Sequence, residues 1–324
     1  MLLGLIPLAA SLLLALTSGG LSRRLSPPVA APLLTLLALA TSVATGTVLC
    51  LAAFSALARQ PFVAAAGGWS RTALRPWDPL PVGWGMLAAA VAAALLAAAC
   101  AYFARATREL VHASRACRRL AAGHGKLVIT RDERPTAYTV PARTGAIVIS
   151  TGMLALLSAD ERRALLAHEA AHLRHHHASY VQLAQLAAAA NPLLRPLARN
   201  VRLAVELWAD QVAAREVGDR RIVARALARA SLAASRQGTR PGIALAIAET
   251  DTRARVRALV DQPRRLRPWA AAVALTLTLA SSMTAVTLTW ATHQQIEIAQ
   301  RAYAQAQAEA QARAQPGVRN GIVS

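Results

Sequence analysis

Charged side chains are scarce in this sequence. Only 16% of its 324 residues are Asp, Glu, Lys or Arg, while 55% are apolar. Soluble domains average roughly 25% charged and 45–50% apolar residues. The shortage of charge therefore argues against a soluble protein and indicates a membrane protein.

Cysteine is also rare, with three residues in the whole chain. Cys50 and Cys100 fall inside apolar segments, and Cys117 lies among basic residues that mark the reducing side of a membrane. These positions argue against a disulfide framework. We expect the cysteines to be small packing residues.

Long uncharged runs account for the apolar excess. The first run begins at the N-terminus, and its arginines, Arg23 and Arg24, follow it. A signal peptide carries its basic residues ahead of the apolar run, so this order predicts a membrane anchor. Trp269 and Trp290 bound the last run at a spacing that spans about 30 Å as a helix, one hydrocarbon thickness. We predict transmembrane helices at about residues 2–19, 29–58, 83–104 and 268–292.

Acidic residues are the scarcer charged type: 16 Asp or Glu stand against 36 Lys or Arg. Residues 105–267 hold 28 of the basic and 13 of the acidic residues. Positive charge next to membrane helices marks the cytoplasmic side. We therefore predict a cytoplasmic domain at 105–267, with the N-terminus and an Ala/Gln-rich tail (293–324) outside. The flanking arginines are Arg105, Arg108, Arg115, Arg118, Arg119, Arg264, Arg265 and Arg267.

A basic domain raises the question of nucleic acid. Aromatic residues make up only 4% of the chain, and no basic stretch has interleaved aromatics or the pattern of a recognition helix. Anionic lipid attracts arginines that adjoin membrane helices. The sequence thus predicts membrane lipid as a partner and no direct nucleic acid binding.

The most informative stretch that is present is His168-Glu169-Ala170-Ala171-His172. Histidines four apart lie on one helix face, so both imidazoles can reach one metal ion, while Glu169 stays beside it as general base for the attacking water. Ser158 and Glu161 form a predicted capping box that starts this helix. The pattern predicts a catalytic zinc site with His168 and His172 as ligands and Glu169 as the catalytic residue.

A catalytic zinc normally takes three protein ligands. The longer pattern with a glycine and a third histidine fails, because His175 and Ala178 stand at those positions. Glu206, on a later helix, is the predicted third ligand. Asp210 lies one turn further on and can accept the free ring N–H of a ligating histidine. A solvated helix face is the alternative for this pair.

Further charged and titratable residues surround the predicted ligands. Arg202 precedes Glu206 by one turn and can pair with it or stabilise an oxyanion, although the three arginines 253, 255 and 257 can supply the same charge. We expect His175, His176 and His177 to extend the motif helix by its last turn and to bind no metal. Short strands are predicted at residues 126–130, 136–140 and 146–150.

Taken together, the motif helix, the Asn191-Pro192 step and the Glu206-x-x-x-Asp210 helix resemble the BlaR/MecR-type antirepressor metallopeptidases, which are membrane-embedded gluzincins. The chain is also similar to membrane proteases of the CAAX-processing and heat-shock type. Receptors of the antirepressor family carry a sensor domain after their last membrane helix. Only residues 291–324 follow Trp290, too few for such a domain, so we expect a peptidase without it.

The resemblance also implies how a substrate binds. In gluzincins a strand edge beside the active-site helix takes up an extended peptide by strand addition. By resemblance this role falls to Ala146, Ile147, Val148, Ile149 and Ser150. The alternative is that the strands merely cover the helix.

The expected fold is a mainly α membrane protein, with four transmembrane helices and a cytoplasmic α+β gluzincin-type zinc peptidase domain between the third and the fourth. The expected function is a zinc-dependent endopeptidase that cleaves a cytoplasmic protein in signalling. By resemblance its substrate is a BlaI/MecI-type repressor, the chain itself, or both. A quality-control protease for membrane proteins stays open. So does a non-proteolytic signalling or scaffold protein with a structural metal site, although such a site needs no base like Glu169.

Overall fold

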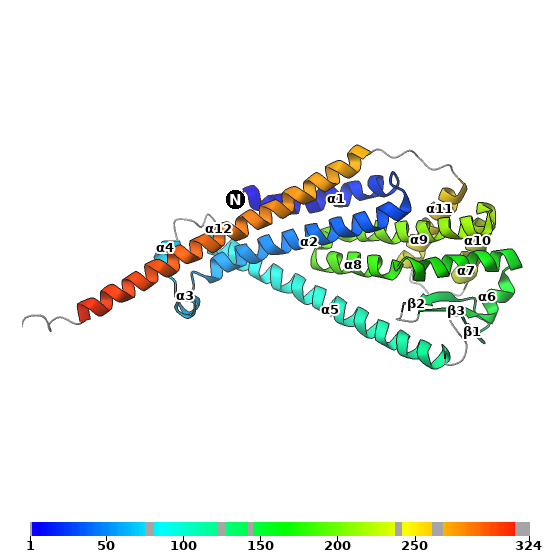
Figure 1. Ribbon diagram of the computed structural model, residues 1–324, viewed down its shortest axis with the longest axis horizontal. Helices are drawn as coiled ribbons and strands as arrows, with labels where there is room; N and C mark the ends of the chain where they lie inside the picture. Colours follow the sequence, from blue (N-terminus) through cyan, green and yellow to red (C-terminus); the bar gives the residue numbers. More distant parts are fainter. Residues whose placement is uncertain are drawn as a thin grey trace, which may run out of the picture. The chain divides into compact units, whose positions relative to one another are not determined.

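The computed structural model describes residues 2–74, 81–121, 127–141, 145–236, 242–260 and 268–314. These residues are mostly helical (Figure 1). Lys126, the arginines 264, 265 and 267, and residues 315–324 of the tail lie outside the described residues. The predictions made for them are therefore not compared with the structure.

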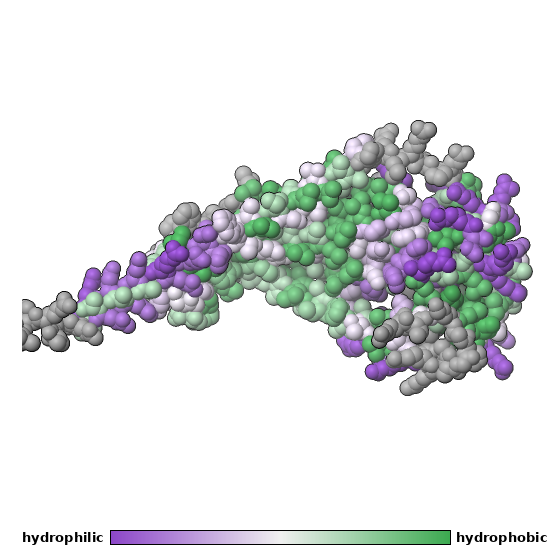
Figure 2. Space-filling view, viewed as in Figure 1, coloured by the Kyte–Doolittle hydropathy of each residue, from purple (hydrophilic) through white to green (hydrophobic). Residues whose placement is uncertain are grey.

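Within the described residues, four helices are long and apolar enough to cross a membrane. Helix α5 runs without interruption into the basic segment, and α12 continues past the predicted end of the fourth span. Figure 2 shows the change along α12, from apolar surface near its start to hydrophilic surface toward Ala314. The four helices are α1 (Ile6–Ser22, after the 3-10 turn Leu2–Leu5), α2 (Pro27–Leu57), α5 (Val82–Ala121) and α12 (Pro268–Ala314).

The chain divides into two compact units, and the divisions fall inside these four helices. The first unit comprises residues 1–11, 40–97 and 276–324. It includes the short helices α3 (Pro61–Gly67) and α4 (Arg71–Leu74). The indole N–H of Trp69 donates to the Ala58 carbonyl at 2.9 Å, and the Ser70 N–H donates to the Ala299 carbonyl at 3.0 Å. These bonds hold the segment between α3 and α4 against α2 and α12.

The second unit comprises residues 12–39 and 98–275 and contains the whole His168–His172 motif. Its largest core cluster joins the adjoining parts of α1 and α2 to two later helices, with Leu34, Leu197 and Val201 fully buried. Those later helices are α8 (His177–Ala190) and α9 (Arg195–Val217), which the 3-10 turn Pro192–Leu194 connects. The predicted Asn191-Pro192 step makes this connection, because the Asn191 side chain accepts from the Leu193 N–H at 3.3 Å.

A small sheet covers one side of the site helix α7 (Ala159–Arg174), which carries His168 and His172. Its strands are β1 (Leu127–Thr130), β2 (Ala137–Val140) and β3 (Ala146–Ser150), as the sequence predicted to within one residue. The order is β1-β3-β2, with β3 parallel to β1 and antiparallel to β2. Ile147 and Ile149 pack toward the site helix, while Val148 packs on the other face beside Ala113 of α5.

This order corrects the expectation for Ala146–Ser150. As the central strand, β3 bonds on one side to β1 and on the other to β2, so it has no free edge for a substrate. Strand addition needs unpaired backbone groups. Among the described residues the free edges belong to β1 and β2, and β2 is the edge that lines the site cavity.

The site helix is α7 (Ala159–Arg174), and its start confirms the predicted capping box. The Ser158 N–H donates to the Glu161 carboxylate at 2.9 Å, and the Ser158 hydroxyl accepts from the Glu161 N–H. Such a cap stabilises a helix by about 1 kcal/mol. Glu161 is buried and also accepts from Arg229 at 3.0 Å, which ties α7 to α10. The remaining helices are α6 (Thr151–Leu156), α10 (Arg220–Arg236) and α11 (Gly242–Val260).

Candidate metal and catalytic site

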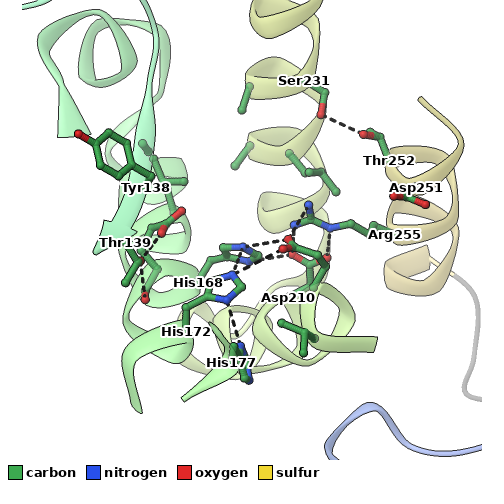
Figure 3. A pocket seen from close by; sticks show the side chains of 18 of the residues that line it. Tyr138, Thr139, His168, His172, His177, Asp210, Ser231, Asp251, Thr252 and Arg255 are labelled. Carbon is green, nitrogen blue, oxygen red and sulfur yellow. Dashed lines mark hydrogen bonds and ion pairs between the residues drawn. The ribbon is translucent and has the colours of Figure 1, made fainter. Parts of the chain in front are cut away.

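Helices α7 and α9 bring the three predicted ligands together. The Nε2 atoms of His168 and His172 lie 3.1 Å apart. The Glu206 carboxylate lies 3.6 Å from the first of these nitrogens and 3.9 Å from the second. One ligand atom from each residue therefore falls within 4.8 Å of the others. Figure 3 shows the rings of His168 and His172 next to each other.

This arrangement fits a zinc ion. Two imidazole nitrogens and one carboxylate are a common catalytic zinc set, which leaves a fourth position open. A tetrahedral ion with bonds of about 2.0–2.1 Å keeps its ligand nitrogens roughly 3.3 Å apart, close to the observed separation. Both histidines also have a hydrogen-bond partner at Nδ1, so their Nε2 lone pairs are the ones that converge.

Asp210 lies where the sequence predicted a partner for a histidine ligand. Its carboxylate is 3.0 Å from Nδ1 of His168 and only 2% exposed. It also accepts two hydrogen bonds from the Arg255 guanidinium, both at 2.7 Å. Arg255, on α11, lies 3.0 Å from the Glu206 carboxylate as well. The Arg255 guanidinium thus binds both Glu206, the predicted third ligand, and Asp210, the partner of His168.

These contacts shift the titration of the metal-free site. Burial alone would lower the pKa of His168, but the Asp210 and Glu206 carboxylates outweigh it and raise that pKa to about 9. Burial would raise the pKa of Glu206 and Asp210, yet His168 and Arg255 hold both values well below their usual range. Metal-free His168 therefore carries a proton at neutral pH, which a bound cation has to displace.

The other histidine ligand has a neutral partner. Nδ1 of His172 lies 3.1 Å from Nδ1 of His177, a residue with no exposed surface. Burial and the neighbouring histidines lower the pKa of His177 to about 3, so it stays neutral. If His172 binds metal through Nε2, its Nδ1–H donates and His177 accepts. Trp208 of α9 packs on His177, with ring centroids 4.8 Å apart.

The histidine run departs from the expected helix. Helix α7 ends at Arg174, His176 has a left-handed backbone (φ 52°), and α8 begins at His177. This break turns His177 back toward His172, whereas His176 is exposed. The expectation that the run continues α7 is therefore wrong. The metal-ligand cluster found among the described residues is His168, His172 and Glu206. That the histidine run binds no metal stays a prediction.

Glu169 lies on the wall of a 950 Å³ cavity and is 8% exposed. The hydroxyl of Thr139, on β2, donates to Oε2 of Glu169 at 2.5 Å, a contact drawn in Figure 3. The three predicted ligands and Asp210 line the same cavity. A potential general base, a metal-binding set and a strand edge therefore share one cavity.

The structure also distinguishes among the arginines that the sequence left open. Arg255 makes the ion pair with Glu206, while Arg202 is exposed on the cavity wall. The sequence offered no means to single out Arg255, because its partners lie on another helix. It gave no signal at all for Thr139. His177 was visible only as a member of a run, since its contact depends on the break at His176.

Comparison with known proteins agrees with this geometry. Residues 101–293 match the model of peptidase family M48, which is more than half of the chain. No curated protein and no solved structure matches. The matched segment contains His168, His172 and Glu206, whose ligand atoms converge. The chain therefore belongs to peptidase family M48, a family of zinc metallopeptidases.

Proposed function

We propose that this metallopeptidase is a membrane-anchored zinc endopeptidase that cleaves extended segments of protein substrates. The observation that carries the proposal is the convergence of His168, His172 and Glu206 beside Glu169 on one cavity wall. A structural metal site needs no base and no cavity. A hydrolytic site needs both, together with an open coordination position.

In this proposal His168, His172 and Glu206 hold the ion. Bound zinc would lower the pKa of the attacking water and polarise the scissile carbonyl. Glu169 accepts a proton from the water and delivers it to the leaving amine. Asp210 fixes the ring of His168 by accepting from Nδ1.

The edge of β2 supports a binding mode for the substrate backbone. The Ser150 N–H donates to the Thr136 carbonyl at 3.0 Å, which marks these two residues as a bonded pair. Bonded and non-bonded pairs alternate along antiparallel strands, so the backbone groups of Ala137 and Thr139 point away from β3. We place an extended substrate along these groups. Apolar cavity walls from Leu165, Val223 and Leu227 then receive a substrate side chain.

We assign to Arg202 the role of the cation that stabilises the oxyanion. Two carboxylates already engage Arg255 at 2.7–3.0 Å. Arg202 lies one turn before Glu206, is exposed, and lines the cavity. A cation in this position can stabilise negative charge on the carbonyl oxygen as water adds.

For the membrane arrangement, we place the peptidase domain in the cytoplasm and both termini outside, because arginines concentrate next to the third and fourth spans. Reporter fusions after Leu120 should be active only as cytoplasmic reporters, and fusions after Gln300 only as exported ones. The reverse pattern would contradict this arrangement.

A cytoplasmic cavity of this kind suits a repressor of the BlaI/MecI type, or the chain itself, as substrate. Damaged membrane proteins are the alternative, and co-expression with a candidate repressor separates the two. If the repressor stays intact while the chain cleaves other proteins, the result favours the quality-control alternative.

The test of hydrolysis compares wild-type protein and Glu169→Gln, both full-length, in detergent and loaded with zinc. Glu169→Gln should keep the metal and lose about 10²–10⁴-fold in the rate of cleavage of labelled casein, because it removes the general base. Equal cleavage by both proteins would exclude hydrolysis at this site. A wild type that binds zinc but cleaves neither casein nor itself would favour a scaffold.

A further inference from the structure

Thr139 belongs to β2, the edge strand proposed to receive the substrate, and its side chain contacts Glu169, the proposed general base. Its hydroxyl donates to Oε2 of Glu169 at 2.5 Å, and the Glu169 carbonyl oxygen lies 3.2 Å from the same hydroxyl. A hydroxyl has one proton to donate, so the shorter contact to the carboxylate takes it. Oε1 of Glu169 is then the oxygen left to accept a proton from water.

The strand geometry explains how one residue reaches both. Thr139 pairs with Ile147 of β3, and side chains of such a pair lie on the same face of the sheet. Ile147 packs toward α7, which directs the Thr139 side chain to Glu169. By the alternation described above, the backbone N–H and C=O of Thr139 point to the free edge of β2. Figure 3 shows Thr139 beside Tyr138 on the strand that faces the histidines.

We propose that Thr139 is a positioning residue that couples the strand edge receiving the substrate to the general base, an inference that rests on the proposed function. Substrate pairing with β2 fixes the strand, and the hydroxyl then fixes the carboxylate of Glu169. The terminal torsion of a glutamate is broad and roughly two-fold, so a carboxylate without this bond has no fixed orientation toward the water. Loss of the hydroxyl should slow the chemical step more than it weakens substrate binding.

The first experiment uses the full-length zinc-loaded protein and labelled casein. Thr139→Val keeps the β-branched shape and removes the hydroxyl, whereas Thr139→Ser keeps the hydroxyl. Thr130→Val makes the same change on the other edge strand, away from the cavity. Thr139→Val should lower kcat about 10-fold, a part of the full effect of a general base, with KM changed less than about three-fold. Thr139→Ser should recover most of the rate, and Thr130→Val should match the wild type.

An unchanged kcat in Thr139→Val would overturn the proposal. A loss that Thr139→Ser shares in full would do the same, because it would then reflect packing and not the hydroxyl. Zinc content should be equal in all four proteins, since Thr139 touches no predicted ligand in the described contacts. Zinc loss in Thr139→Val would assign the residue to metal binding, contrary to the proposal.

The second experiment needs no turnover. A peptide hydroxamate shares a proton with the general base when it binds the metal, whereas the matched thiol peptide does not. Thr139→Val should weaken the hydroxamate about 3–10-fold and the thiol less than about two-fold, as a single hydrogen bond to a charged group predicts. If Thr139→Val and wild type bind the hydroxamate with equal affinity, the role of Thr139 is overturned while the proposed function still stands. Failure of the wild type to bind either peptide would overturn the proposed function, and the role of Thr139 with it.

Discussion

The two walls of the site hold its histidines by different chemistry. The charged wall consists of Glu206, Asp210 and Arg255, on α9 and α11. The neutral wall consists of Thr139 on β2 and His177 at the start of α8. His168 is held by the charged wall, through Asp210, and His172 by the neutral wall, through His177.

The difference matters for how each wall tolerates change. In the charged wall every group is paired while largely buried, so removal of one partner leaves a buried charge without compensation. The residues of the neutral wall carry no charge, so removal of one of them removes no counter-charge. The bond between His177 and His172 is a neutral hydrogen bond, which contributes about 0.5–1.5 kcal/mol. We infer that the charged wall determines whether the metal ligands assemble. The neutral wall sets how finely His172 and Glu169 are oriented.

The largest effect should come from the ligands that both walls support. The double variant His168→Ala, His172→Ala removes two of three ligands and should empty the site and abolish cleavage. Wild-type protein purified in detergent should contain about one zinc per chain by elemental analysis. Zinc at the wild-type level in the double variant would contradict the assignment of the site.

Breaking the charged wall should have the next largest effect. Arg255→Met leaves the Glu206 and Asp210 carboxylates to share the single positive charge of protonated His168. It should lower the stability of the metal-free protein by about 3–5 kcal/mol. Arg257→Met, at an exposed position of the same helix, should change stability by less than about 0.5 kcal/mol. Thermal unfolding in detergent measures both.

Arg255→Lys provides a second measure of the charged wall should the methionine variant fail to accumulate. It keeps the charge but lacks the two parallel donors that Asp210 now accepts at 2.7 Å each. Its stability should fall between those of wild type and Arg255→Met. Wild-type stability in both Arg255 variants would show that the charged wall does not hold the site together.

Much of this site could be predicted because its signals are local. His168 and His172 share a face by their spacing on one helix, and Ser158 and Glu161 cap that helix through neighbouring residues. The strands were equally visible, as short β-branched runs between turn residues. The placement of Glu206 opposite the histidines depends on a second helix. The four-residue spacing between Glu206 and Asp210 indicated that the two side chains share one face of that helix.

The remaining contacts arise from tertiary structure alone. Arg255 lies 45 residues from Asp210, and Thr139 lies 30 residues from Glu169. The substrate edge was assigned to β3, because sequence shows that a strand exists but not which neighbours pair with it. The break at His176 carries no glycine or proline signal, although a left-handed backbone is uncommon for other residues. Packing of His177 against Trp208 and His172 stabilises that break.

A smaller effect is expected when the charged wall keeps its shape but loses a charge. Asp210→Asn retains an oxygen that can accept from His168, but it pairs less strongly with Arg255. Zinc affinity should fall about 10–100-fold, as for other partners of histidine ligands. Asp219→Asn is the matched control, since its side chain accepts from the Arg221 N–H at a helix start where asparagine serves equally well. Competition with a chromophoric chelator gives both affinities. Unchanged affinity in Asp210→Asn would remove Asp210 from the charged wall.

The smallest effect should come from the neutral wall, and it tests the comparison most directly. His177→Leu fills the buried space but leaves the Nδ1–H of His172 without its acceptor. Zinc affinity should fall about 10-fold, at the low end for such partners, because a neutral acceptor binds less strongly than a carboxylate. His177→Asn retains an acceptor and should recover part of the loss. His176→Asn is the control, because His176 is exposed and asparagine tolerates its left-handed backbone. If His177→Leu instead lowers the zinc affinity as much as Asp210→Asn does, the two walls contribute equally to zinc binding. Wild-type affinity in His177→Leu would show that His172 needs no partner, and orientation would then rest on the charged wall alone.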